Sequence, residues 1–203
     1  MERKKSPERL VFFTDAVVAI ALTLLVLPLA DIVPELVASG KEPVDAITEN
    51  FGPIFSFVLS FVVIARMWWG HHRIFEEIRA YSAPLVYVNF VWIFTIAVLP
   101  FPTEITGSFS ANRFAAMFYT GTIFVSSAAQ SAMVLIVRRD RTVAMSADSV
   151  TDRWLANTLL STGALLIAFV AAAIEPTLGY YAMLLLIAAP WVAAWLTRGR
   201  AER

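Results

Sequence analysis

The chain has 203 residues, of which 59% are hydrophobic and only 16% are charged, and its formal net charge is zero. An ordinary soluble domain is about 45–50% apolar and about 25% charged, so this composition is typical of a membrane protein. Zero net charge without a basic stripe gives no reason to expect a nucleic-acid partner. The lack of cysteine excludes a disulfide framework, a thiolate metal site and a cysteine nucleophile.

Six apolar runs are long enough, or nearly so, to cross a bilayer, since a helix of roughly 20 residues spans the hydrocarbon core. The first run is longer than the roughly 7–15 apolar residues of a signal peptide, so we interpret it as a membrane span. The runs are continuously apolar and do not alternate, which favours helices over the strands of a barrel. The predicted helices cover residues 10–29, 51–69, 84–102, 114–137, 154–174 and 178–196. We predict an all-α, polytopic membrane protein with a single six-helix domain over residues 1–203.

The basic residues are distributed unequally between the two sides that these helices define. All of the 16 Lys and Arg residues except Lys41 and Arg113 fall on the N-terminal side of the bilayer. Loops rich in Lys and Arg stay in the cytoplasm. We therefore predict a protein of the cell membrane with both termini on the cytoplasmic side. The acidic segment 30–50 lies on the outer side, where it would raise the local cation concentration.

The first predicted helix carries two charges, Arg9 and Asp15, that do not share a face. At about 100° per residue, Asp15 lies about 140° around the helix from Ile20. A charge inside a span costs about 2.5–3.5 kcal/mol and normally faces other helices. We therefore expect Asp15 to join an interhelical network, with a proton-carrying role left open, and Arg9 to extend to the membrane surface. The face opposite Asp15 reads Arg9, Phe13, Ala16, Ile20, Thr23, Leu24 and Leu27. On spacing alone, such an apolar stripe indicates packing.

Three motifs carry a resemblance to a known family. They are Arg9-x-x-x-Phe13-Thr14-Asp15, RMWWGHHRIF over residues 66–75 and VNFVWIFTIAVLPFPTEITG over residues 88–107. Together they resemble the transmembrane protein 175 (TMEM175) family, potassium channels of endolysosomes with shorter prokaryotic relatives. The family signature of the first helix is Arg-x-x-x-Phe-Ser-Asp. Thr14 keeps the hydroxyl of that signature, and Ala16 stands where the family usually has glycine.

The resemblance implies a potassium-selective, passive cation channel. Short family members have six helices per subunit, assemble as homotetramers and line a central pore with the first helix. They lack the Thr-Val-Gly-Tyr-Gly carbonyl filter, and this sequence contains no such loop. Their hydrophobic constriction corresponds by motif to Ile20, Leu24 and Leu27, and the hydroxyl associated with selectivity corresponds to Thr23. The implied partners are potassium ions, membrane lipid and further copies of the chain. No cofactor is implied, and no metal other than the permeating potassium.

The resemblance also suggests how the pore helix is held. Side chains that match family positions on the second and third helices can reach Asp15 from behind. The expected anchoring set comprises Arg9, Phe13, Thr14, Asp15, Trp68, His71 and Asn89. The adjacent His71 and His72 point about 100° apart on a helix, so a network or interfacial role is expected rather than a metal pair.

Two other classes of function were compared with the channel. A proton-coupled secondary transporter with Asp15 as carrier is the alternative, and it predicts a discontinuous helix near the middle of the membrane. Pro28 lies close to the end of its predicted span, which leaves Pro190 as the candidate break. An enzyme is not expected, because no acid, base and nucleophile gather at one depth.

Overall fold

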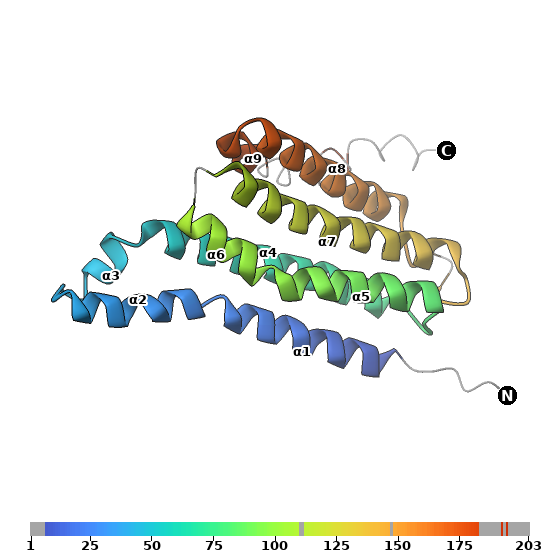
Figure 1. The fold of residues 1–203 in the computed structure, drawn as a ribbon. Coiled ribbons are helices and arrows are strands. Elements are labelled where there is room, and N and C mark those ends of the chain that lie inside the picture. Colours follow the sequence, from blue (N-terminus) through green and yellow to red (C-terminus); the bar gives the residue numbers. More distant parts are fainter. Residues whose placement is uncertain (1–6, 110–111, 147, 183–191, 193, 195–203) are drawn as a thin grey trace.

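The computed structural model describes residues 7–109, 112–146, 148–182, 192 and 194. Within these residues the chain is almost entirely helical (Figure 1). The helices are α1 (Glu8–Leu24), α2 (Leu27–Ala38), α3 (Asp45–Thr48), α4 (Phe51–Glu76), α5 (Ala83–Val98), α6 (Pro100–Ser108), α7 (Arg113–Arg139), α8 (Asp152–Ile174) and α9 (Pro176–Ala182). The predicted all-α fold class is confirmed.

Five of the described segments are long and apolar enough to cross a membrane, namely Glu8–Ala38, Phe51–Glu76, Ala83–Ser108, Arg113–Arg139 and Asp152–Ile174. The chain is therefore a multi-pass membrane protein. Each segment runs past at least one end of its predicted span, because helices continue through the polar and charged residues that end an apolar run. The sixth predicted helix, 178–196, lies mostly outside the described residues; α9 covers its first part.

The first span differs most from its prediction. The predicted helix 10–29 is interrupted after Leu24, and α2 then extends the segment to Ala38. Proline has no N–H, so Pro28 cannot donate to the carbonyl oxygen of Leu24. The intervening Leu25 and Val26 keep right-handed helical dihedral angles, so the axis is interrupted without unwinding. The structure thus interrupts the first segment close to Pro28, whereas Pro190, the candidate break expected from the sequence, lies outside the described residues.

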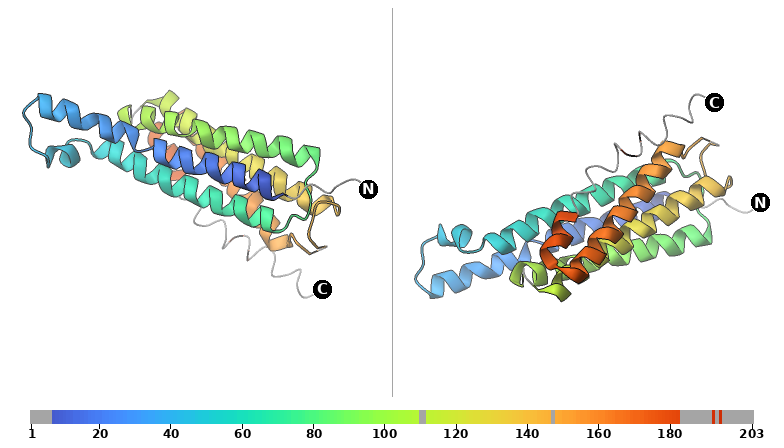
Figure 2. Two further views of the ribbon diagram at one scale, coloured as in Figure 1. Left: turned by 90° about the horizontal axis from the view of Figure 1, so that it is seen from below. Right: turned by 90° about the horizontal axis from the view of Figure 1, so that it is seen from above.

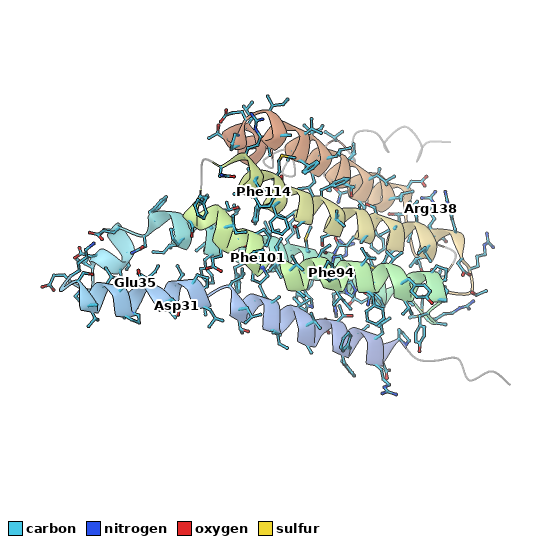
Figure 3. The ribbon with its side chains drawn as sticks, viewed as in Figure 1. Asp31, Glu35, Phe94, Phe101, Phe114 and Arg138 are labelled. Carbon is cyan, nitrogen blue, oxygen red and sulfur yellow. The ribbon has the colours of Figure 1, made fainter. Side chains whose placement is uncertain are left out.

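The spans form layers, with α1 and α8 on opposite faces and α4, α5 and α7 between them (Figures 1 and 2). The segment Glu8–Ala38 is about 46 Å long at 1.5 Å per residue, against roughly 30 Å of hydrocarbon. Its far end, α2, projects with α3 beyond the other helices. Asp31 and Glu35 lie on this projection, whereas Arg138 lies at the opposite end of the molecule (Figure 3).

Small residues let the helices approach closely. The backbone of Gly107 on α6 lies so near Gly52 on α4 that a Cβ on Gly52 would lie 3.1 Å from the Gly107 carbonyl oxygen. Membrane helices associate through such close backbone contacts and through interhelical hydrogen bonds, because lipid provides no hydrophobic driving force between them. The largest buried side chains, Trp92 and Tyr119, come from α5 and α7 and fill the middle layer.

Candidate pore helix and its hydrogen-bond network

α1 has one buried and one exposed face in the isolated subunit. Thr14, Val18, Ala21 and Leu25 are buried and recur every three or four residues, which is the period of a helix face. This face packs against α4 and α5. The exposed residues include Arg9, Phe13, Ala16, Ile20, Thr23 and Leu24 on α1, together with Leu27 at the start of α2. These seven form the face that the helical wheel groups opposite Asp15.

Asp15 is half-buried and points toward α4. The indole Nε1–H of Trp68 donates a hydrogen bond to Oδ1 of Asp15 over 2.8 Å. The bond gives one carboxyl oxygen of Asp15 a partner inside the protein and so offsets part of the cost of placing this polar side chain in a span. The bond joins the first and second spans.

Thr14, next to Asp15, joins α1 to α5 and, through α5, to α4. The amide nitrogen of Asn89 donates to Oγ1 of Thr14 over 3.2 Å, and Oγ1 of Thr14 donates to the Leu10 carbonyl over 2.8 Å. The Oδ1 atom of Asn89 lies 2.6 Å from Nε2 of His71. Since an amide oxygen only accepts, His71 carries its proton on Nε2 in this arrangement. Thr14, Asp15, Trp68, His71 and Asn89 are called the α1 network below.

The imidazole of His71 is completely buried and held between two aromatic rings. Its centroid lies 4.2 Å from the Trp92 ring and 4.5 Å from the Phe75 ring, both nearly parallel to it. Its Nδ1 has no hydrogen-bond partner among the described residues. The stack fixes the plane of the imidazole and therefore the direction in which Nε2 meets Asn89.

The remaining predicted residues lie outside this network. The Phe13 ring packs against Phe90 with centroids 6.2 Å apart, so it contacts α5 without a polar bond. Arg9 is exposed on the first turn of α1. His72 is partly exposed, and its Nε2 lies 3.5 Å from the Glu76 carboxylate, so the two adjacent histidines do not share a partner. No group of three or more His, Cys, Asp or Glu side chains in the described part of the chain could hold a metal ion.

Sequence reasoning missed Trp92 and Phe75, the residues that sandwich His71. The spacing of Asn89 and Trp92 was a usable signal, because residues three apart share a helix face. It also missed a second buried polar chain, in which the hydroxyls of Thr103 and Ser60 are 2.8 Å apart and Ser60 donates to the Tyr119 hydroxyl over 3.0 Å. That chain joins α6, α4 and α7.

The fold and this arrangement define an all-helical, multi-pass membrane protein whose first helix presents an apolar face and is held from behind by polar contacts. Comparison with known proteins shows which family the chain resembles. Residues 9–100 match the family model described as endosomal/lysosomal potassium channel TMEM175, and this region includes α1, α4 and α5 almost entirely. A protein of Streptomyces collinus named potassium channel is 31% identical over 113 residues, covering 53% of each chain.

A second relative and a solved structure come from one organism. A Chamaesiphon minutus protein named potassium channel is 32% identical over 133 residues, covering 59% of this chain and 60% of the relative. The crystal structure described as a lysosomal potassium-selective channel TMEM175 homolog from Chamaesiphon minutus superposes with a TM-score of 0.72 at 25% identity. That likeness covers 92% of this chain and 97% of the other. Residues 9–100 thus resemble the TMEM175 family, and the fold of a wider part of the chain resembles that of a solved TMEM175 homolog. The sequence matches span little more than half the length of these two relatives.

Proposed function

We propose that the chain is one subunit of a potassium-selective, passive cation channel in which α1 lines a central pore. The observation that carries the proposal is the division of α1 into an exposed apolar face and a face held by the α1 network. Ile20, Leu24 and Leu27 are 58%, 41% and 52% exposed in the isolated subunit. The family match and the names of the relatives support potassium as the permeant ion.

An apolar face on a membrane helix can also simply contact lipid, but two polar residues on this face argue for water. Arg9 and Thr23 lie on it together with the apolar residues. A charged side chain in a span normally faces the protein interior or a water-filled cavity. In a homotetramer, four copies of this face would surround one axis and place these polar groups in the pore.

The hydroxyl of Thr23 is oriented to face a cation. Its single O–H donates to the carbonyl oxygen of Ile20 over 2.8 Å. Because that bond uses the only proton, the outward side of the oxygen carries lone pairs alone. Four such oxygens would replace part of the hydration shell of an ion that passes the ring.

The rings of Ile20, Leu24 and Leu27 would form the constriction. Hydrophobic constrictions gate by dewetting, and an ion that passes one must lose part of its water. Potassium loses water more easily than sodium, so such a ring favours potassium without a carbonyl-loop filter. In this scheme the α1 network sets the rotation of α1 and hence the direction of the Ile20 side chain.

We further propose that the channel lies in the cell membrane with both termini inside. The concentration of basic residues on one side supports that orientation. The acidic residues of α2 and of the segment after it would then stand at the outer mouth, where negative charge attracts cations.

A proton-coupled transporter with Asp15 as carrier is the second candidate, and the interruption between α1 and α2 favours it. Discontinuous helices are typical of transporter binding sites. However, Leu25 and Val26 keep helical dihedral angles. Asp15 also lies more than two turns before the interruption, so it is not part of it. Asp15 accepts a hydrogen bond from Trp68, and an indole N–H is a donor only, so this partner offers no acceptor for a proton that Asp15 would carry.

Flux through liposomes separates these functions. Purified protein in potassium-loaded liposomes should show passive flux in the order potassium, caesium and then sodium, without a proton gradient. Ile20→Asn should keep or raise the flux and lower the potassium-to-sodium ratio. Ile167→Asn is the matched control, since Ile167 is 56% exposed and belongs to α8, the span that lies on the opposite face of the subunit from α1. An unchanged ratio in Ile20→Asn, or flux only with a proton gradient, would contradict the channel proposal.

A further inference from the structure

A second polar feature lies on the side of the subunit away from α1. A cavity of about 390 Å³ opens among α4, α7 and α8. Its lining includes Arg66 and Arg73 from α4, Gln130 from α7, and Trp154 and Asn157 from α8. α1 contributes nothing to it, and Figures 1 and 2 show α1 and α8 on opposite faces. The proposed conduction pathway therefore does not use this cavity.

The two arginines of this cavity are not neutralised within the described residues. They stand seven positions apart, so they share one face of α4 and lie about 10 Å apart along its axis. Neither guanidinium forms an ion pair or donates a hydrogen bond in the part of the chain that the structure describes; the ion pairs there join Lys41 to Glu49, His72 to Glu76 and Arg138 to Asp152. Ten N–H donors thus face the cavity or its mouth.

Aromatic residues give the depth of the cavity. Trp69 and Trp154 both line it, and tryptophan concentrates where the bilayer meets water. The guanidinium of Arg73 lies 5.3 Å from the centroid of the Trp154 ring, a cation–π contact that holds its position. A cation–π contact adds no acidic partner to the guanidinium, so its charge stays available to an anion. The cavity is thus at headgroup level on the basic side of the membrane.

A buried acceptor completes the site. The Oδ1 atom of Asn157 is buried and has no hydrogen-bond partner among the described residues. A buried amide oxygen without a partner is unfavourable, and a bound hydroxyl would supply the missing hydrogen bond. The neighbouring Ser161 adds a hydroxyl to the same wall. Gln130 is held in place because its Nε2 donates to the Met67 carbonyl over 2.5 Å.

The geometry points to a binding site for an anionic phospholipid of the leaflet on the basic side, with its phosphate between Arg66 and Arg73. A headgroup that carries a hydroxyl, such as that of phosphatidylglycerol, donates to Asn157. Basic cavities between membrane helices at headgroup level suit anionic lipids, whose acyl chains lie along the exposed surface of the helices. The lipid joins α4 to α7 and α8, and stabilises the peripheral helices against the middle layer.

Thermal unfolding of the full chain in neutral detergent tests the site. A ligand that binds the folded state raises its unfolding temperature in a concentration-dependent way. The probes are phosphatidylglycerol, phosphatidylcholine and inorganic phosphate, each titrated separately. We expect phosphatidylglycerol alone to raise the unfolding temperature. Arg66→Gln/Arg73→Gln should weaken its apparent affinity about 30-fold, since each arginine near an anionic lipid contributes roughly fivefold.

The control variant removes the same number of positive charges at positions outside the cavity. Arg139→Gln/Arg141→Gln removes two exposed arginines on the same side of the membrane but outside the cavity, and it should bind like the unmodified protein. Ser161→Trp fills the cavity and retains both arginines, and it should also lose phosphatidylglycerol binding. An equal loss in the control, an equal effect of phosphatidylcholine, stabilisation by phosphate alone or full binding by Ser161→Trp would each overturn the proposal.

Discussion

Replacing Asn89 with leucine tests whether the α1 network sets the rotation of α1. Asn89 is completely buried, and it links Thr14 on α1 to His71 on α4 through contacts of 3.2 and 2.6 Å. Leucine has a similar volume, so the main loss is both hydrogen bonds. Interhelical hydrogen bonds in membrane proteins average about 0.6 kcal/mol and reach about 1.7 kcal/mol. Removing both should therefore lower the free energy of unfolding by about 1–3 kcal/mol.

The same substitution should lower selectivity if the network directs Ile20 into the pore. A rotation of α1 would turn Ile20 away from the axis and admit a more hydrated ion, so the potassium-to-sodium flux ratio should fall toward one. The assay combines denaturant unfolding in detergent with liposome flux on the same preparation. Trp68 stays bonded to Asp15 in this variant, so α1 remains docked at a second point.

A matched control separates a general loss of stability from a change in the direction of the Ile20 side chain. The hydroxyl of Thr162 on α8 contacts Ser127 and Ser131 on α7 over 2.8 and 2.7 Å. Thr162→Val also removes two interhelical contacts, but these join α7 to α8 and do not involve α1. It should cost similar stability and leave the flux ratio unchanged. If Asn89→Leu loses stability and retains full selectivity, or if Thr162→Val loses selectivity equally, the proposed role of the network is wrong.

Two further substitutions test local features of the structure. Gly179→Ala should lower the unfolding temperature, because the added Cβ would lie 2.5 Å from the Cβ and 2.9 Å from the Cα of Ala172. Gly163→Ala is the control: its Cβ meets nothing within 4 Å, so it should be neutral or slightly stabilising. In the loop after α7, hydrogen bonds from the side chain and then the backbone of Thr142 lower the pKa of Asp140. That stabilisation is present above the ordinary aspartate pKa and is lost as pH falls through the lowered folded-state pKa. Thr142→Val should therefore move the carboxyl titration of Asp140, followed by NMR, toward its ordinary range; an unmoved titration would exclude the side-chain bond as the cause.

Hydropathy predicted the membrane spans because crossing a bilayer demands long apolar helices, whatever the rest of the fold. It located their ends poorly, since a helix persists through Arg73 and Glu76 once their side chains can reach water. The interruption after Leu24 depends on one missing N–H at Pro28, and a 20-residue window does not resolve it. The sequence also did not predict the length of α2. Its acidic residues end the apolar run, so this part was interpreted as an outer loop, yet the helix continues through them to Ala38.

The α1 network shows a different limit. A charged residue inside a span normally faces other helices and pairs with a polar group there. The sequence alone therefore predicts an interhelical contact for Asp15. The sequence does not predict which residue is the partner, because that depends on the relative rotation of three helices. In the structure Trp68 bonds to Asp15, Asn89 bonds to Thr14, and His71 bonds to Asn89. The hydroxyl at position 14 is thus a structural contact in its own right rather than a local helix bond alone.

The position of the polar contacts along α1 accounts for how one helix can be both fixed and adjustable. Its interhelical hydrogen bonds come from Thr14 and Asp15, about two turns into the helix. Beyond them α1 touches its neighbours through small or apolar side chains such as Val18 and Ala21, which allow sliding at little cost. The interruption after Leu24 lies beyond these contacts, so α2 itself is not held by the α1 network. A motion of α2 would therefore reach the Leu24 and Leu27 level of the proposed constriction first, while the α1 network keeps Ile20 in place.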